Sequence, residues 1–349
     1  MVIISLIFIV FQVFTHSLFG ITVYDRNVNN TTVGGYMDTE WLSNDDVNTF
    51  KAHRLIIQYG ARLTPAIRFN SEIEYEYAGF VTNKDSQDTN QKGELKIEQA
   101  WLDHDLSDAF TLRTGIILVP VGQLNIYHDS DLRDFTARPL VNYYIIPTTW
   151  MDTGIGGYGQ IELGDIEFTY EGYLFNGLDH TNSYSSTKGT RGMRPNFKND
   201  TNRGKAVAAR LGVIPSINSE FGLSTYQGQS SQSMVAFDGR FNRGAFGLKG
   251  EAAAYTDGYN NDASGYNIES KFNVAPFIGA SHPINALARY ESIDLMANDS
   301  SAGALTKTSF GVNIRPVPSL VYKLEYAIEN AQVVDDNAHS IMASVAVGF

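Results

Sequence analysis

Alternation of apolar and polar residues with a period of two is the feature that most constrains the fold of this chain. It is clearest in residues 320–329, 68–77 and 341–349, where aliphatic and aromatic side chains recur at every second position. Successive side chains of a β-strand point to opposite faces, whereas a helix repeats every 3.6 residues. In the second segment the opposite face carries Glu72, Glu74 and Glu76. The pattern predicts an all-β fold in which each strand has one apolar and one polar face.

Two all-β architectures share this alternation. A soluble sandwich buries its apolar faces against each other, whereas a membrane barrel turns them toward lipid and encloses the polar faces. The sequence predicts about 16 strands, an even number as bacterial barrels require. They are expected at residues 32–41, 51–62, 67–80, 93–102, 110–118, 153–163, 166–175, 205–213, 219–226, 233–241, 245–255, 265–274, 286–294, 307–314, 320–330 and 340–349.

The lengths of the expected connections favour the barrel. Short turns such as Gly164-Asp165 alternate with longer polar loops such as Val81–Lys92, Asn176–Gly204 and Ala331–His339. Outer-membrane barrels have short periplasmic turns and long extracellular loops, whereas nothing in a sandwich requires short and long connections to alternate. The predicted fold is therefore a transmembrane antiparallel β-barrel, with Ala275–Asn285 as the one connection that departs from the rhythm.

Composition and charge exclude several classes of protein. The 31 Gly, 19 Tyr and 20 Phe residues, with only 18% charged residues, suit many short strands joined by turns. With 0 Cys there is no disulfide framework and no thiolate zinc site. The net charge of −12 argues against nucleic-acid binding, which requires clustered Lys and Arg. Beyond its beginning the chain has no long apolar stretch, so a membrane-spanning form must be a closed barrel.

The beginning of the chain resembles an export signal. The apolar run Val2–Val13 is too short to span a bilayer and is followed by the polar residues Thr15-His16-Ser17. Residues 1–20 are predicted to be a signal peptide cleaved near Gly20, and residues 21–349 to be one barrel domain. No Lys or Arg precedes the apolar run, and a buried strand or helix is the alternative.

Residues 93–150 resemble porins of the phosphate-selective O and P family. The segments that carry the likeness are Gly93–Trp101, Leu112–Gly115, Leu118–Gly122, Arg138–Val141 and Ile146–Trp150. The closing Phe349 is similar to the terminal signature of outer-membrane barrels. The resemblance implies a homotrimeric, water-filled pore in the bacterial outer membrane, and a long loop, Pro120–Asp152, that folds inward to narrow it.

The alternation assigns many charged residues to the lumen of the expected barrel. The predicted pore-lining residues are Arg54, Arg62, Arg68, Glu72, Glu74, Glu76, Lys96, Glu98, Arg113, Lys323 and Glu325. Over the whole chain the lumen is expected to hold roughly eleven basic and thirteen acidic residues. A phosphate filter needs a ring of one sign. We therefore expect passive diffusion of small hydrophilic solutes or ions, with an anion- or phosphate-selective porin as the alternative.

A charged stretch falls within the expected inward loop. The predicted constriction residues are His128, Asp129, Asp131, Arg133, Asp134 and Arg138. A solvated surface loop with internal ion pairs is the alternative. The stretch lacks the Gly and the distal Glu of a calcium loop, so no metal site is predicted, and no cofactor is expected. The expected partners are outer-membrane lipid, lipopolysaccharide, and small solutes or ions.

One basic cluster has three open interpretations. It consists of Arg191, Arg194, Lys198, Arg203 and Lys205. It suits a vestibule that collects anions, a site for the phosphates of lipopolysaccharide, or a hydrated surface without function.

Two other classes of protein remain as alternatives to a porin. An outer-membrane barrel hydrolase would need a Ser/His/Asp set near the outer rim, but His104 is expected in a periplasmic turn and His180 in an external loop. We therefore expect no enzyme. A secreted all-β binding domain would be soluble without detergent. The aromatic residues expected to form interfacial girdles in the barrel are Tyr75, Tyr77, Tyr322, Tyr326 and Phe349.

Overall fold

The computed structural model describes residues 31–78, 93–179, 184–194, 204–258, 261–297, 303–331 and 334–349, with the side chains of 334–337 left out. The predicted signal peptide, residues 1–20, lies outside the described residues. The barrel belongs to one compact unit, Thr32–Phe349. Among the described residues, no helix is long and apolar enough to cross a membrane.

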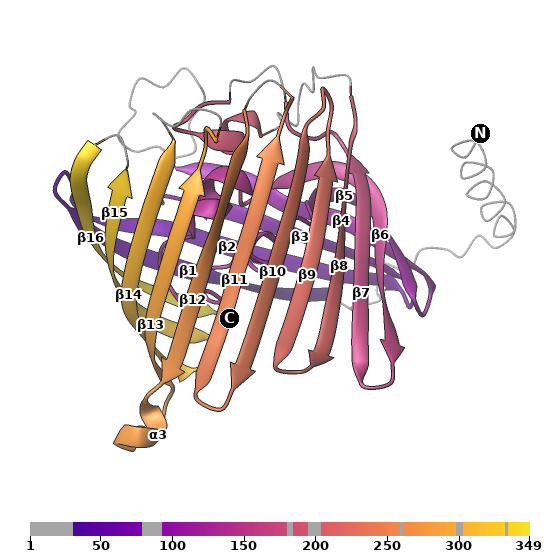
Figure 1. Cartoon of the computed structure of the whole chain (residues 1–349). Coiled ribbons are helices and arrows are strands. Elements are labelled where there is room, and N and C mark those ends of the chain that lie inside the picture. Colours follow the sequence, from indigo (N-terminus) through magenta and orange to yellow (C-terminus); the bar gives the residue numbers. More distant parts are fainter. Residues whose placement is uncertain are drawn as a thin grey trace, which may run out of the picture. The chain divides into compact units, whose positions relative to one another are not determined.

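Sixteen antiparallel strands form a closed barrel (Figure 1). They are β1 (Thr31–Asn44), β2 (Asn48–Thr64), β3 (Ile67–Glu76), β4 (Glu94–Ser107), β5 (Phe110–Leu118), β6 (Met151–Leu163), β7 (Ile166–Phe175), β8 (Ala206–Ser216), β9 (Ser219–Gln227), β10 (Ser233–Arg243), β11 (Phe246–Thr256), β12 (Ala263–Asn273), β13 (Ile284–Asp294), β14 (Ala304–Val317), β15 (Leu320–Ala331) and β16 (Val334–Gly348). Every strand pairs with its neighbours in sequence, and β1 pairs with β16 from Tyr36↔Gly348 to Asn44↔Ser340. Closure leaves no strand edge without a partner, as a membrane requires.

The predicted barrel and its strand number are confirmed, whereas several strand boundaries and connections need correction. Strand β3 ends at Glu76 and not at residue 80. The loop expected at Ala331–His339 is wrong, because the ladder of β15 and β16 continues to Ala331↔Val334. The stretch Ala275–Asn285 contains a short helix, α3 (Ala275–Ile278), at the short-turn end of the barrel (Figure 1). Polar residues continue a ladder as well as apolar ones, so hydropathy does not mark where strands end.

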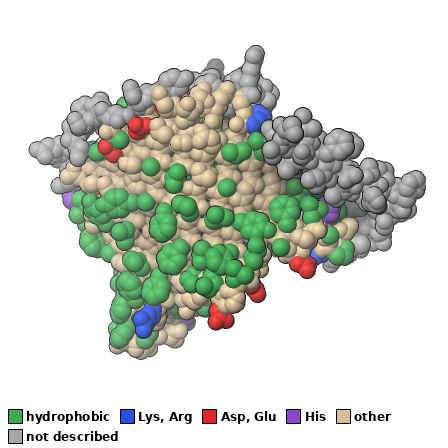
Figure 2. Space-filling model, turned by 45° about the vertical axis from the view of Figure 1, so that its right-hand side comes forward, with side chains coloured by type: hydrophobic (Ala, Val, Ile, Leu, Met, Phe, Trp, Pro, Cys, Tyr) green, Lys and Arg blue, Asp and Glu red, His purple; other side chains and the backbone are tan. Residues whose placement is uncertain are grey.

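Each strand is amphipathic in the sense opposite to that of a soluble protein. In β15, Tyr322 and Leu324 are 46% and 54% exposed, whereas Lys323 between them is 5% exposed. Figure 2 shows the hydrophobic side chains as a belt across the outer face, with charged side chains at its margins. A contiguous apolar exterior of this extent is unfavourable in water and favourable in lipid. The apolar face is therefore the lipid-facing one.

The connection between β5 and β6, residues 119–150, folds into the lumen instead of covering the rim. We call it the infolded segment; it includes the short helices α2 (Gln123–Ile126) and η2 (Val141–Ile145). Its apolar side chains form the core of the molecule with the inner faces of β7 to β13. Trp150 is the centre of this core, with ring centroids 4.9 Å from Tyr226 and 6.3 Å from Phe175.

Candidate functional site in the barrel lumen

The infolded segment is held at its base by one asparagine and one glycine. The side-chain amide of Asn125 donates to the carbonyl oxygens of Val119 (2.8 Å) and Trp150 (3.0 Å), and its Oδ1 accepts from the backbone amide of Trp150 at 2.8 Å. Gly122 has a φ of +74°, and a Cβ there would lie 1.6 Å from Oε1 of Glu251. The segment can therefore enter the lumen this closely only with glycine at this position.

Charged wall residues bind the far part of the infolded segment through its backbone. Lys323 donates to the carbonyl of Ser130 at 2.5 Å, and Arg289 to that of Ala137 at 3.0 Å. Glu325 accepts from the Ala137 amide at 3.0 Å. These side chains satisfy backbone groups that would otherwise be buried without partners. Strands β13 and β15 thereby fix the path of the segment across the lumen.

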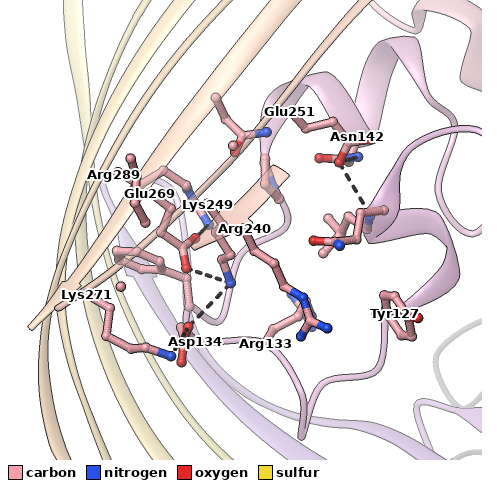
Figure 3. A pocket seen from close by; sticks show the side chains of 18 of the residues that line it. Tyr127, Arg133, Asp134, Asn142, Arg240, Lys249, Glu251, Glu269, Lys271 and Arg289 are labelled. Carbon is pink, nitrogen blue, oxygen red and sulfur yellow. Dashed lines mark hydrogen bonds and ion pairs between the residues drawn. The ribbon is translucent and has the colours of Figure 1, made fainter. Parts of the chain in front are cut away.

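A cavity of about 490 Å³ remains between the infolded segment and strands β10 to β13 (Figure 3). Its charged lining residues are Arg133, Asp134, Arg240, Lys249, Glu251, Glu269, Lys271 and Arg289. Five of these residues are basic and three are acidic. Tyr127 lines the cavity from the side of the infolded segment.

Three of the five basic side chains of the cavity are partly exposed, whereas Arg133, Arg289 and the three acidic side chains are buried. Arg240 is 49% exposed, and Lys249 and Lys271 are each 34% exposed. In contrast, Glu269 is 4% exposed and pairs with Lys249 at 2.7 Å. Glu251 is buried and accepts from the side-chain amide of Asn142 at 2.9 Å. A mobile ion in the cavity therefore meets a surface of positive potential.

Asp134 joins the infolded segment to this wall. Its Oδ2 lies 3.4 Å from Nζ of Lys249 and 3.3 Å from Nζ of Lys271, and its Oδ1 accepts from Asn313 at 3.1 Å. Burial alone would raise the pKa of Asp134, but Lys249, Lys271 and Arg315 outweigh it and hold the pKa below its usual range. The carboxylate thus stays charged and docked near neutral pH.

The predicted pore-lining residues lie on other parts of the wall, and none of them lines this cavity. Most are joined in ion pairs: Arg54 with Glu74 (2.9 Å) and Glu76 (3.2 Å), Lys96 with Glu74, Arg68 with Asp105, Arg113 with Asp103 (2.7 Å), and Glu325 with Arg289 (3.3 Å). Lys323 binds the infolded segment, Arg62 is exposed at the β2–β3 turn, and Glu72 and Glu98 are buried beside His128. Their assignment to a pore stays a prediction.

The predicted constriction residues all belong to the infolded segment, but they do not act as one group. Arg133 and Asp134 line the cavity. Arg138 donates to the carbonyl of Thr148 at 2.9 Å, within the segment. His128 is buried and faces Glu98. Asp131 has its carbonyl bound by Arg315 at 2.9 Å. Only two of the six, Arg133 and Asp134, therefore line the cavity beside β10 to β13.

The residues of the basic cluster are also divided. Arg191 donates to the carbonyl of Thr148 at 3.0 Å and lies over the ring of Tyr143, and Arg194 donates to the carbonyl of Thr149 at 3.3 Å. These two residues hold the infolded segment. Lys198 and Arg203 lie outside the described residues, as does His180. His104 lies within β4 and not in a turn, which corrects that expectation.

Sequence reasoning did not single out Arg240, Lys249 and Lys271. The alternation places all three in the lumen, among the roughly eleven basic residues expected there. Nothing in the sequence shows that the infolded segment packs against the inner wall of the barrel and still leaves a cavity beside β10 to β13.

No family model matches the chain. An uncharacterized protein of Aquifex aeolicus is 26% identical over 347 residues, which covers 88% of this chain and 77% of that protein.

Several solved outer-membrane proteins share the fold. OmpF of Salmonella typhi, in complex with daunomycin, aligns with a TM-score of 0.59 at 8% identity, over 91% of this chain and 97% of that chain. The anion-selective porin of Comamonas acidovorans aligns at 0.57 and 12% identity, over 91% and 99%. The trimer form of OmpT from Vibrio cholerae aligns at 0.57 and 10% identity, over 91% and 99%.

At these identities the likeness concerns the fold alone. The chain has the fold of an outer-membrane porin, a closed barrel of 16 antiparallel strands with an apolar exterior. Such a barrel lies in the bacterial outer membrane.

Proposed function

We propose that the protein is a porin that lets small hydrophilic solutes cross the outer membrane passively, with a preference for anions. The observation that carries the proposal is the orientation of charges in the cavity, where Arg240, Lys249 and Lys271 are open to solvent and the neighbouring carboxylates are buried. Over the whole lumen, counting the roughly eleven basic and thirteen acidic residues expected there gives no clear preference for either sign. Their exposure does, because a passing ion can approach the exposed cations more closely than the buried carboxylates that pair with them.

In this proposal the cavity is the narrow part of the diffusion path, and the infolded segment sets its width. The charged residues of both signs that are predicted to line the rest of the lumen, such as Arg54 and Glu98, would guide solutes toward the cavity. The path needs no chemistry, so the protein is proposed to be no enzyme. The anion-selective porin of Comamonas acidovorans shares the fold, which supports the proposal without carrying it.

We further propose that the protein assembles as a homotrimer in contact with outer-membrane lipid and lipopolysaccharide. The trimer form of OmpT from Vibrio cholerae, which has the same fold, supports this assembly. The resemblance of residues 93–150 to the phosphate-selective O and P family supports both the trimer and the infolded constriction. Residues 1–20 are proposed to be the export signal. Native mass spectrometry of the purified protein in detergent tests the assembly.

Recording from the purified protein in a planar bilayer with a KCl gradient tests the channel. We expect stepwise conductance and a reversal potential of the sign that chloride permeation produces. Adding phosphate distinguishes a general anion path from a phosphate site, because only a site would block the chloride current. Silence in the bilayer would overturn the porin proposal, and a cation-selective reversal potential would overturn the anion preference.

A further inference from the structure

Away from the cavity, three buried residues from three segments meet inside the barrel. Glu72 of β3, Glu98 of β4 and His128 of the infolded segment place one potential ligand atom each within 4.8 Å of the others. Their exposed fractions are 4%, 0% and 1%. Buried carboxylates are normally paired with a cation or with hydrogen-bond donors.

This cluster is short of such partners. Among the described residues, neither oxygen of Glu98, nor Oε1 of Glu72, nor Nε2 of His128 makes a well-formed hydrogen bond, and the pairing of Glu98 with His128 is long, at 3.5 Å. Oδ1 of Asp129, the next residue along the infolded segment, also makes no well-formed hydrogen bond. Several carboxylate oxygens thus share a buried site with one imidazole, and a bound cation would pair with them.

The imidazole is oriented as a metal ligand. Nδ1 of His128 lies 3.1 Å from the carbonyl oxygen of Asn125. A carbonyl only accepts, so when the ring is neutral Nδ1 carries the proton and Nε2 keeps a free lone pair. Backbone carbonyls hold metal-binding histidines in the same way. Nε2 lies 3.5 Å from Oε2 of Glu98 and 3.7 Å from Oδ1 of Asp129.

A β-bulge turns the carboxylates toward the cluster. Glu72 pairs with Gln99, and Ile73 pairs with Ile97, so Glu98 is the extra residue of β4. The amide of Gln99 donates to Oε2 of Glu72 at 2.8 Å, and Gln58 donates to the same oxygen at 3.4 Å. These contacts fix the carboxylate of Glu72 and leave its second oxygen available.

We propose that Glu72, Glu98 and His128 bind a divalent first-row transition metal, with Zn²⁺ as the preferred ion and Asp129 as a further ligand. An imidazole with carboxylates suits Zn²⁺ better than Ca²⁺ or Mg²⁺, which prefer oxygen ligands alone. Ligand atoms about 2.0–2.1 Å from a tetrahedral zinc ion lie roughly 3.4 Å apart, close to the separations around Nε2 of His128. The ion would clamp the infolded segment to β3 and β4.

A second His and carboxylate cluster in the same barrel serves as a control. Nδ1 of His53 lies 2.9 Å from Asp38 and 3.1 Å from Glu40. Its Nε2 lies 3.1 Å from the guanidinium of Arg54, and Asp38 also accepts from the Arg54 amide. The imidazole there is already engaged on both sides, so we assign no metal to it.

The test uses the full-length protein, purified in detergent, stripped with a chelator and titrated with Zn²⁺ by calorimetry. We expect one Zn²⁺ per chain in the wild type and in His53→Asn, and binding at least about 100-fold weaker in Glu98→Gln and His128→Asn. Heat-modifiable migration on gels verifies that each variant is a folded barrel. Binding that is unchanged in Glu98→Gln, or that is lost in His53→Asn, would overturn the assignment.

Two measurements on the wild type do not depend on variants. Co²⁺ in place of Zn²⁺ should give the visible absorption of a four-coordinate site, and its absence would contradict the proposed geometry. Tighter binding of Ca²⁺ or Mg²⁺ than of Zn²⁺ would overturn the choice of a transition metal. The site is judged by metal binding itself, so a failure of the porin proposal in bilayer recordings would leave this result unaffected.

Discussion

Neutralising the open cations of the cavity should abolish the anion preference of the channel. The perturbation is the double variant Arg240→Gln and Lys271→Gln, which removes two positive charges that are 49% and 34% exposed. Glutamine is shorter than arginine or lysine, but it is neutral and keeps a hydrogen-bonding amide, so neither variant places a new negative charge beside Glu220 or Asp134, the partners of Arg240 and Lys271 in the structure.

The magnitude follows from Coulomb's law in a water-filled cavity. A monovalent ion about 5 Å from one unit charge gains or loses about 0.8 kcal/mol in water. Salt at 0.1 M reduces this to about 0.5 kcal/mol. Loss of both charges therefore costs an anion about 1 kcal/mol and favours a cation by the same amount. Each permeability changes by about fivefold, and the ratio of anion to cation permeability falls roughly twenty-fivefold.

Reversal potentials in a KCl gradient measure this ratio directly. The matched control is Arg62→Gln, which removes one cation of the predicted pore-lining set. Arg62 is exposed at the β2–β3 turn, donates to the carbonyl of Pro65 and does not line the cavity. We expect the control to keep the wild-type ratio. A double variant with an unchanged ratio would refute the role given to the cavity cations, and a large change in the control would assign selectivity to the turn end of the barrel.

Three further predictions concern the infolded segment. In Gly122→Ala the new Cβ would collide with Glu251 and lie 2.8 Å from Ile146, so the infolded segment should move off the wall and single-channel conductance should rise. Unchanged conductance would argue against the infolded segment as the constriction. Trp150→Ala should weaken docking of the segment by about 3–5 kcal/mol, seen as faster hydrogen exchange in residues 119–150 while the strands stay protected. Because the pKa of Asp134 is lowered in the folded protein, its stabilising effect is complete above the ordinary carboxyl pKa of about 4 and is lost as the pH falls further. Asp134→Asn should therefore lower thermal stability at pH 6 and flatten its decline below pH 4, and parallel curves for both proteins would contradict the docking role.

The strand pattern of this protein could be predicted from the sequence because it depends on local periodicity. Lys323 and Glu325 alternate with Tyr322, Leu324 and Tyr326, and the period of two is a property of the strand itself. The rhythm of short and long connections then decided between a sandwich and a barrel. The ends of β3 and β16 were not predictable in this way, because a ladder ends where its partner strand ends.

The site required the tertiary structure. The alternation assigns Arg113, Lys249 and Glu251 alike to the lumen, and only the path of the infolded segment decides that one is paired away from the cavity and the others line it. In the same way, Glu72, Glu98 and His128 meet across three segments because the infolded segment brings His128 to β3 and β4, where the carbonyl of Asn125 orients it. Sequence periodicity fixes which face of a strand a side chain occupies. What faces it across the lumen depends on packing between segments distant in the chain, and no local pattern encodes that.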